Sequence, residues 1–434
     1  MERDRILKDL EESGFLANWE KSVIEPAQQA VFLGVGINSV KRILTVPSEK
    51  VQIMKRLVQN ELSKVKSTAR RISRIAGKII SFGIALGKVT RMFTREMYFW
   101  IETAPSWDSM IEISAEVKAE LEFWQEVDVR DYFCPIWTVY SNELKNSLFS
   151  DAGNTGWGGW LAPTKDRPER LEARSHLTLE ERTESSTLRE LVGIFGNLQA
   201  FVEFISNTST VVYTDSDCST KILRKGCSSK SKLHRINVQI YLFCIEHNIR
   251  LESYWIPRDL NELADYLAGI YDENDWKLSD FWFNFLDVKP GWGKHTMDRF
   301  ATDKNCLLAR FNSAWYCPGT SGVDCFIQTD WFKENNWCNP PFGLIGRLLH
   351  TLREHRARAT IIVPRWTGRH WWPIICPDGQ HFASFVVDWV ELPRNSWGQP
   401  LFLPGAARAN QFAVGSPNYR VFAIRVDFAN YTPV

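Results

Sequence analysis

The spacing of apolar positions changes along the chain and predicts where helices and strands lie. Residues 1–13 follow helical spacing and stop at Gly14, a residue typical of helix C-termini. Strands are expected at residues 30–35 and 43–46. Pro47 then begins a long helix, because proline fits the first turn. Helical patterning continues to about Val127, so residues 1–127 form a mainly helical segment in this interpretation.

From about residue 144 the pattern changes to short strands that alternate with helices. Strands are predicted at residues 148–151, 156–162, 171–176, 210–214 and 250–256, and helices at 186–205, 233–247 and 260–268. The order β-β-β-α-β-α-β-α is typical of a mixed five-stranded sheet flanked by helices, so residues 144–271 are predicted to be an α/β domain. A Trp-rich acidic stretch at residues 272–287 is interpreted as a hinge, and residues 276–434 as a second α/β domain.

Composition limits the functional classes. The 434 residues suffice for two or three domains. With 52 Lys and Arg against 51 Asp and Glu, any case for nucleic-acid binding must be local. The 19 tryptophans either fill cores or stack on bases. Nine cysteines without metal-ligand spacing argue against structural zinc, and their odd number with no signal peptide favours the cytoplasm or nucleus. The apolar stretches are too short to span a membrane.

One basic stretch is a local candidate for contact with nucleic acid. It comprises Lys64, Lys66, Arg70, Arg71 and Arg74. These residues either form the solvated face of a helix or contact phosphates.

Four acidic residues carry the main chemical hypothesis: Asp151, Glu190, Asp215 and Asp265. Two follow strand-like runs and two lie on helix-like runs, so alternating strands and helices can bring them to one edge. Mg²⁺ prefers carboxylate oxygens, and two such ions can activate water and stabilise the leaving oxygen of a phosphodiester. Each acid also has an ordinary explanation: Asp151 as a turn residue, Glu190 in a capping box with Thr187, Asp215 as an N-cap, and Asp265 on a solvated helix.

The short motifs around these acids resemble the ribonuclease H domain of reverse-transcribing retroelements. They are Ser150-Asp151-Ala152-Gly153, Leu188-Arg189-Glu190-Leu191, Tyr213-Thr214-Asp215-Ser216-Asp217 and Asn261-Glu262-Leu263-Ala264-Asp265. The resemblance implies that the four acids bind two Mg²⁺ ions and cut the RNA strand of an RNA–DNA hybrid. This chain departs from the pattern in two places. Many members have a histidine in the loop that Pro257, Arg258, Asp259 and Leu260 fill here, and Ala268-Gly269 replaces the common Ser-Arg.

The first 120 residues resemble the palm end and thumb of a reverse transcriptase. The matching strings are Ser13-Gly14-Phe15-Leu16, Glu20-Lys21-Ser22, Val31-Phe32-Leu33-Gly34 and Pro47-Ser48-Glu49-Lys50. The Tyr-x-Asp-Asp signature of the polymerase does not occur in the chain, so polymerisation by this chain alone is not expected. The resemblance implies a retroelement polyprotein fragment whose upstream polymerase portion is a partner.

A separate string, Asn339-Pro340-Pro341-Phe342, has chemistry of its own. An Asn oxygen and a Pro carbonyl can accept hydrogens from an adenine amino group, and an aromatic ring can stack on a flipped base. The wider segment resembles the adenine-N6 DNA methyltransferase-like domains of DIRS-type retrotransposons, with Asp298 in the motif on the S-adenosylmethionine side. The Phe-x-Gly-x-Gly loop is missing, and Arg299 stands where a small residue is common. A simple turn in a structural domain is the alternative.

The main hypothesis is therefore a retroelement-derived ribonuclease H. A catalytically inactive nucleic-acid-binding remnant and a DNA adenine methyltransferase are its alternatives.

Overall fold

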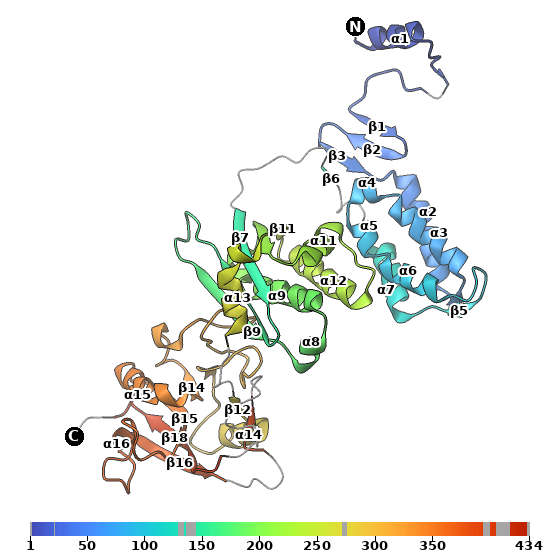
Figure 1. Ribbon diagram of the computed structural model, residues 1–434. Helices are drawn as coiled ribbons and strands as arrows, with labels where there is room; N and C mark the ends of the chain where they lie inside the picture. The colour runs from blue at the N-terminus through green and yellow to red at the C-terminus, as the bar shows by residue number, and fades with distance from the viewer. Residues whose placement is uncertain are drawn as a thin grey trace. The chain divides into compact units, whose positions relative to one another are not determined.

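The computed structural model describes residues 2–20, 22–128, 134–135, 145–270, 276–393, 400–404 and 417–431. Two compact units make up the chain (Figure 1). One comprises residues 1–142 and 225–238, and the other residues 143–224 and 239–434.

The first unit combines a small antiparallel sheet with helices. The sheet has the order β1-β2-β3-β6, with β1 at Gln29–Phe32, β2 at Val35–Asn38, β3 at Ile43–Thr45 and β6 at Cys134–Pro135. Its helices are α1 Glu2–Glu12, α2 Ser48–Leu62, α3 Ala69–Ile80, α4 Gly83–Leu86, α5 Val89–Met92, α6 Arg95–Thr103 and α7 Ala115–Glu126, and β4 Lys66–Ser67 pairs with β5 Ile111–Glu112. The single strand predicted at residues 30–35 is a hairpin instead. Leu33 and Gly34 both take positive φ and turn the chain there.

The basic stretch at residues 64–74 runs from the end of α2 into α3. Ile72, Ile75 and Ile79 form the buried face of α3. Lys64 pairs with Glu61 at 2.7 Å, and Arg70 forms two hydrogen bonds with Asp108. Lys66, Arg71 and Arg74 are exposed, so both interpretations of this stretch stay open.

The second unit contains the five-stranded mixed sheet that the sequence predicts. The strands are β7 Lys145–Ala152, β8 Gly156–Leu161, β9 Leu171–His176, β10 Ser209–Thr214 and β11 Arg250–Trp255, in the order β11-β10-β7-β8-β9. β7, β10 and β11 are parallel, whereas β8 runs antiparallel to β7 and β9. The helices that accompany this sheet in sequence are α8 Leu179–Thr183, α9 Ser186–Ala200, α10 Val202–Ile205, α11 Asp217–Lys225, α12 Ser231–Glu246 and α13 Glu262–Gly269. The first half of α12 belongs to the first unit. This mixed α/β arrangement is consistent with a ribonuclease H-like fold. The sequence pattern did not predict α8 or α11.

Two glycines of β8 let helices approach the sheet closely on both faces. A Cβ on Gly158 would lie 2.4 Å from the backbone nitrogen of Ala268 in α13. A Cβ on Gly159 would lie 2.2 Å from Oδ1 of Asn197 in α9. Because real Cβ atoms do not approach other atoms so closely, both positions require glycine for this packing.

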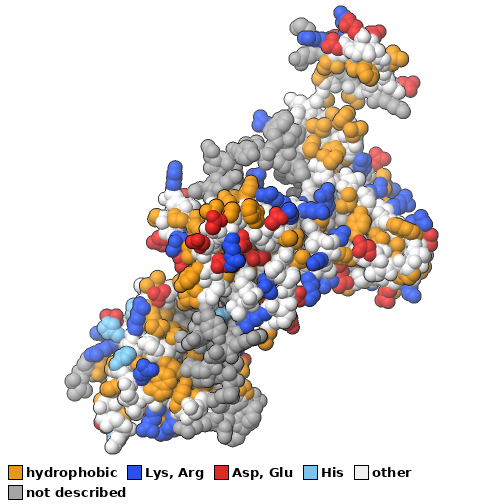
Figure 2. All heavy atoms as spheres, in the orientation of Figure 1, with side chains coloured by type: hydrophobic (Ala, Val, Ile, Leu, Met, Phe, Trp, Pro, Cys, Tyr) orange, Lys and Arg blue, Asp and Glu red, His pale blue; other side chains and the backbone are white. Residues whose placement is uncertain are grey.

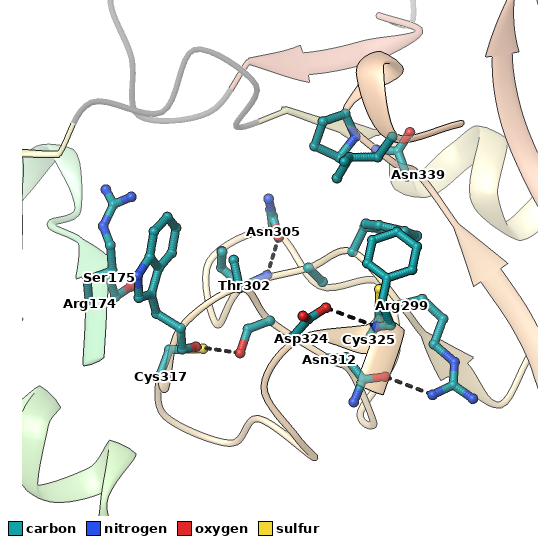
Figure 3. A pocket seen from close by; sticks show the side chains of 18 of the residues that line it. Arg174, Ser175, Arg299, Thr302, Asn305, Asn312, Cys317, Asp324, Cys325 and Asn339 are labelled. Atoms are coloured by element: carbon teal, nitrogen blue, oxygen red, sulfur yellow. Dashed lines mark hydrogen bonds between the residues drawn. The ribbon is translucent and has the colours of Figure 1, made fainter. Parts of the chain in front are cut away.

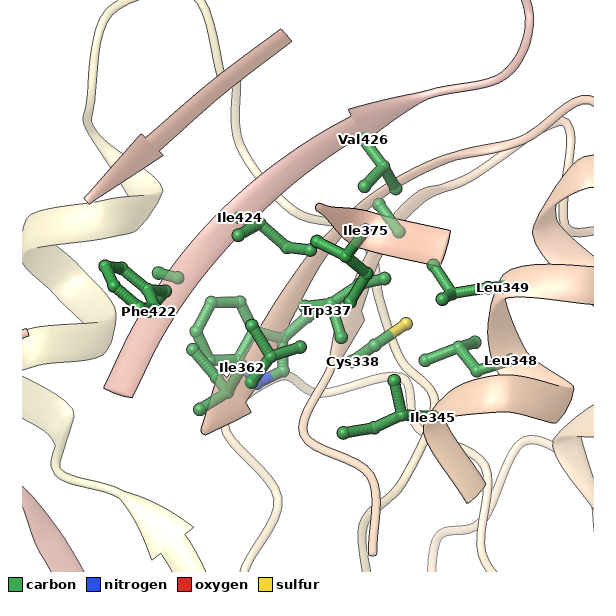
Figure 4. Packing of buried hydrophobic residues seen from close by; sticks show 14 of the residues in the cluster. Trp337, Cys338, Ile345, Leu348, Leu349, Ile362, Ile375, Phe422, Ile424 and Val426 are labelled. Carbon is green, nitrogen blue, oxygen red and sulfur yellow. The ribbon is translucent and has the colours of Figure 1, made fainter. Parts of the chain in front are cut away.

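A second five-stranded sheet forms the core of the C-terminal part. Its order is β13-β14-β15-β18-β16, with β13 Met297–Asp298, β14 Asn335–Cys338, β15 Arg358–Pro364, β16 Val386–Leu392 and β18 Val421–Asp427. The first three strands are parallel, and β18 is antiparallel to both of its neighbours. Trp337, Ile362 and Ile424 from the sheet pack with Leu348 and Leu349 of α15 Ile345–Glu354 (Figure 4).

The hinge expected at residues 272–287 is wrong for residues 276–287, and residues 271–275 lie outside the described ones. Instead, β12 Trp276–Leu278 pairs with β17 Phe402–Pro404, and α14 Asp280–Asp287 follows. Trp276 and Trp282 are buried in the C-terminal core. The prediction failed because large indole side chains gain stability when their apolar surface is buried. These tryptophans therefore pack into the core and do not form a hinge.

On the face of the molecule in view, basic (blue) and acidic (red) side chains are interspersed (Figure 2). This agrees with a formal net charge of +1. Within the described part of the chain, no helix combines the length and apolar character that crossing a membrane requires.

Candidate metal centre

The register of the first large sheet brings two of the four acidic residues together. β10 pairs with β7 in parallel, with Tyr213 opposite Phe149. Asp151 follows Phe149 by two residues, and Asp215 follows Tyr213 by two. Because side chains alternate along a strand, both carboxylates reach the same face at the same level.

The third acid, Glu190, comes from α9. Ser185 begins this helix by accepting a hydrogen bond from the backbone N–H of Leu188. Gly193, one turn after Glu190, gives the helix room beside Ala152 of β7, since its Cβ position lies 3.2 Å from the Ala152 Cβ. The buried face of α9 therefore presents Glu190 to the end of β7.

Asp151, Glu190 and Asp215 form a cluster in which one ligand atom from each lies within 4.8 Å of the others. Oε2 of Glu190 is buried without a hydrogen-bond partner. Such an orphaned carboxylate oxygen among other carboxylates is costly unless a proton or a cation offsets its charge.

Burial and mutual repulsion raise the pKa values of two of these groups. Burial raises the pKa of Asp151 to about 7, and the charges of Asp215 and Asp265 add to the effect. Burial raises the pKa of Glu190 to about 9, reinforced by Asp151 and Asp215. Without a cation, the cluster therefore holds protons near neutral pH.

Asp265 lies at the rim of the cluster, on α13. Its Oδ1 accepts a hydrogen bond of 2.7 Å from Nη2 of Arg258. Its negative charge contributes to the raised pKa of Asp151, which indicates that it lies near Asp151. The structure thus brings all four predicted acids to one region, with three in the cluster and Asp265 bound to Arg258.

Two of the ordinary explanations for these acids do not hold. The N-cap of α9 is Ser185, so Thr187 and Glu190 form no capping box. Ser216, not Asp215, accepts the hydrogen bond from the backbone N–H of Ser219 at the start of α11.

Two buried asparagines position the strand that carries Asp151. Nδ2 of Asn197 donates to Oγ of Ser150 at 3.1 Å, and Nδ2 of Asn261 donates to the Ser150 carbonyl at 3.1 Å. Neither asparagine was predicted as a functional residue. Asn197 lies two helical turns after Glu190 on the same face of α9, and this spacing is a usable sequence signal.

This donor set fits a hard divalent cation. Carboxylate oxygens are the preferred ligands of Mg²⁺ and Mn²⁺, and no sulfur or imidazole belongs to the cluster of described residues.

A second site is a cavity of about 330 Å³ beside the C-terminal sheet (Figure 3). Its lining includes Trp276, Asn305, Asn339 and Pro341, and β9 contributes Arg174 to another wall. This volume lies within the range of small-molecule sites.

The Asn-Pro-Pro-Phe string directly follows β14, at the carboxyl ends of the parallel strands, where ligands bind in open α/β sheets. Asn339 is buried. Its Nδ2 donates to the carbonyl of Trp276, while its Oδ1 has no hydrogen-bond partner.

Phe342 and Asp298, two other predicted residues of this site, are also buried. The Phe342 ring packs against Trp276 and Trp366, with centroids 5.2 and 4.9 Å away. The carboxylate of Asp298 accepts hydrogen bonds from the backbone N–H groups of Phe300 and Leu307, and burial raises its pKa to about 7. Within the string, Asn339 and Pro341 line the cavity, whereas Pro340 and Phe342 do not. Asp298 does not line the cavity either.

Searches for related proteins give matches only among solved structures. No protein-family model and no curated protein matches the chain. The N-terminal RNase H domain of a Mycobacterium tuberculosis protein is 22% identical with a TM-score of 0.25, covering 29% of this chain and 91% of that one. RNase H1 of Halobacterium salinarum is 19% identical with a TM-score of 0.25, covering 29% and 94%.

A foamy viral protease–reverse transcriptase in complex with double-stranded DNA also matches. It is 17% identical with a TM-score of 0.27, and the match covers 58% of this chain and 41% of the viral one. The solved structures that resemble part of this chain thus include RNase H domains and reverse transcriptases. Because every TM-score is below 0.5, these likenesses by themselves establish neither activity nor substrate.

Proposed function

We propose that residues 145–270 are a ribonuclease H-type nuclease that hydrolyses the RNA strand of RNA–DNA hybrids with two divalent cations, in the cytoplasm or nucleus. The observation that carries the proposal is the cluster of Asp151, Glu190 and Asp215, with the orphaned Glu190 oxygen and with Asp265 at its rim. A structural role alone would not need several buried carboxylates that repel one another.

The four acids have distinct tasks in this proposal. Asp151 and Asp215, held level by paired strands, would hold the two cations together with Glu190 and Asp265. Two bound divalent cations supply an activated water and stabilisation of the leaving oxygen. Asn197 and Asn261 keep Asp151 in place through Ser150. The upstream polymerase portion of a retroelement polyprotein is the proposed partner of the first unit.

The test is cleavage of a labelled RNA–DNA hybrid by the full chain with Mg²⁺. We expect Asp215→Asn to lower the cleavage rate by at least about a hundredfold, because it removes a charge that would hold the cations while it preserves shape. Asp259→Asn, an exposed change in the neighbouring loop, is the matched control and should retain activity. Cleavage that persists in Asp215→Asn would exclude this assignment.

A second candidate function, adenine-N6 methyl transfer, is favoured by one observation at the C-terminal cavity. The free Oδ1 of buried Asn339 is an acceptor that suits an amino group such as that of adenine. S-adenosylmethionine, when bound, would supply the methyl group. Trp276 lies in the cavity wall, so it is better placed than Phe342 to contact a planar ring.

Calorimetric titration with S-adenosylmethionine tests this second candidate independently of the nuclease. If Asn339→Ala still binds S-adenosylmethionine but no longer transfers a methyl group to DNA, the result would support the role of Asn339 as the acceptor for adenine. Absence of binding to the unaltered chain would exclude methyl transfer.

A further inference from the structure

The rim of the carboxylate cluster carries a cation that belongs to the chain itself. Arg258 lies in a short 3-10 turn, residues Arg258–Leu260, between β11 and α13. Its Nη2 binds Oδ1 of Asp265 at 2.7 Å, and its side chain is 75% exposed whereas that of Asp265 is 45% exposed. The pair is therefore accessible to solvent and can separate.

The charge of Arg258 acts on more of the cluster than Asp265. The pKa of Arg258 is raised by its hydrogen bond to Asp265 and then by the charges of Asp265, Asp215 and Asp151. In return, Arg258 opposes the rise in the pKa of Asp151. The guanidinium thus binds Asp265 directly and also favours the charged form of Asp151.

A second arginine near the cluster is held differently. Arg189 acts on Glu190, but its guanidinium donates to the carbonyls of Arg182 and Glu184 and to Oδ1 of Asn154. These hydrogen bonds fix Arg189 to the end of α8, to the residue that follows it and to the turn between β7 and β8. Arg258, whose described hydrogen bond goes to a carboxylate of the site, is the cation that a metal ion would meet there.

We propose that Arg258 is the internal counter-ion of the carboxylate cluster and that it competes with a divalent cation for Asp265. In the cation-free protein its guanidinium occupies Asp265. Two positive charges cannot share this carboxylate without repulsion, so binding of a divalent cation at Asp265 displaces Arg258 towards solvent. The proposal rests on the proposed function for the choice of cation, whereas its test measures cation binding and not cleavage.

The test is a calorimetric titration of the full chain with Mn²⁺ as the probe. We expect Arg258→Gln to raise the apparent affinity by about three- to tenfold, because the variant removes a competing charge from a partly exposed site. Arg258→Lys keeps the charge but loses the planar donor geometry, so its affinity should lie between the two.

Arg250→Gln is the matched control. Arg250 is exposed at the opposite end of β11, about 17 Å from the strand end that leads to Arg258. This variant removes the same charge at a position far from the cluster and should change the affinity less than twofold.

A double-mutant cycle with Asp265→Asn shows whether the competition involves Asp265. In the Asp265→Asn background, Arg258→Gln should no longer raise the affinity. An unchanged or lower Mn²⁺ affinity in Arg258→Gln, or no Mn²⁺ binding by any of these proteins, would overturn the inference. If Mn²⁺ affinity rises as expected but hybrids stay intact, the nuclease proposal fails and the role of Arg258 stands.

Discussion

The four acidic residues differ in burial, and burial raises the pKa values of two of them. Asp151 and Glu190 are buried, and their pKa values are raised to about 7 and about 9. Asp265 reaches solvent beside Arg258. A bound cation therefore stabilises the folded protein most where it replaces the protons of the two buried carboxyl groups.

These shifts predict how the stability of the cation-free protein depends on pH. A raised folded-state pKa means that the folded protein binds more protons than the unfolded chain once pH exceeds the ordinary values of these acids. Stability therefore falls as pH rises through the folded pKa values. We expect a loss on the order of 2 kcal/mol between about pH 5 and pH 8 in chelator, from urea unfolding at each pH.

Glu190→Gln and Mg²⁺ are the controls for this pH dependence. The variant removes one titrating group and should flatten the curve, and saturating Mg²⁺ should restore stability at the alkaline end. A cation-free protein that becomes more stable as pH rises over this interval would contradict the assigned burial of the two carboxyls.

At the scale of the elements, α13 reaches the cluster because β8 carries glycine where the helix crosses it. The Cβ position of Gly158 lies 2.4 Å from the Ala268 nitrogen and 2.5 Å from the Leu267 Cβ. The glycines of β8 are visible in the sequence, but a turn or a bend explains glycine equally well there. Only the packing of α13 against β8 explains why residue 158 is glycine.

Gly158→Ala tests this packing. The added methyl group forces α13 away from β8, so we expect a loss of about 1–3 kcal/mol in the free energy of unfolding and weaker Mn²⁺ binding as Asp265 moves. Gly153→Ala is the control, because its nearest atom, the Ala268 carbonyl oxygen, is 3.5 Å away. Equal stability of the two variants would exclude close packing at Gly158.

At the scale of the whole molecule, the near-zero net charge makes any nucleic-acid contact a local property. The exposed Lys66, Arg71 and Arg74 of the first unit are the candidates. If they contact phosphates, changing all three to Gln should make the slope of log affinity against log salt shallower by up to about 3. Filter binding of an uncleavable hybrid measures this slope.

The outcome decides between the two interpretations of the basic stretch. An unchanged slope identifies it as the solvated face of α3. Steep salt dependence that Mg²⁺ does not alter, without cleavage of a normal hybrid, would favour the inactive nucleic-acid-binding remnant over the nuclease.

The sequence by itself determined the succession of the five strands in residues 145–270 and singled out the four acids, because apolar periodicity and short motifs are local properties. The strand at residues 171–176 was predicted at its observed bounds.

Tertiary structure alone decided which groups meet. Glu190 keeps an oxygen without a partner, Asp151 and Asp215 meet across paired strands, and Trp276 joins a core instead of a hinge. Each of these features depends on the approach of residues far apart in the chain or on the burial of a particular atom. Distances and burial between such residues arise from packing, which periodicity does not encode.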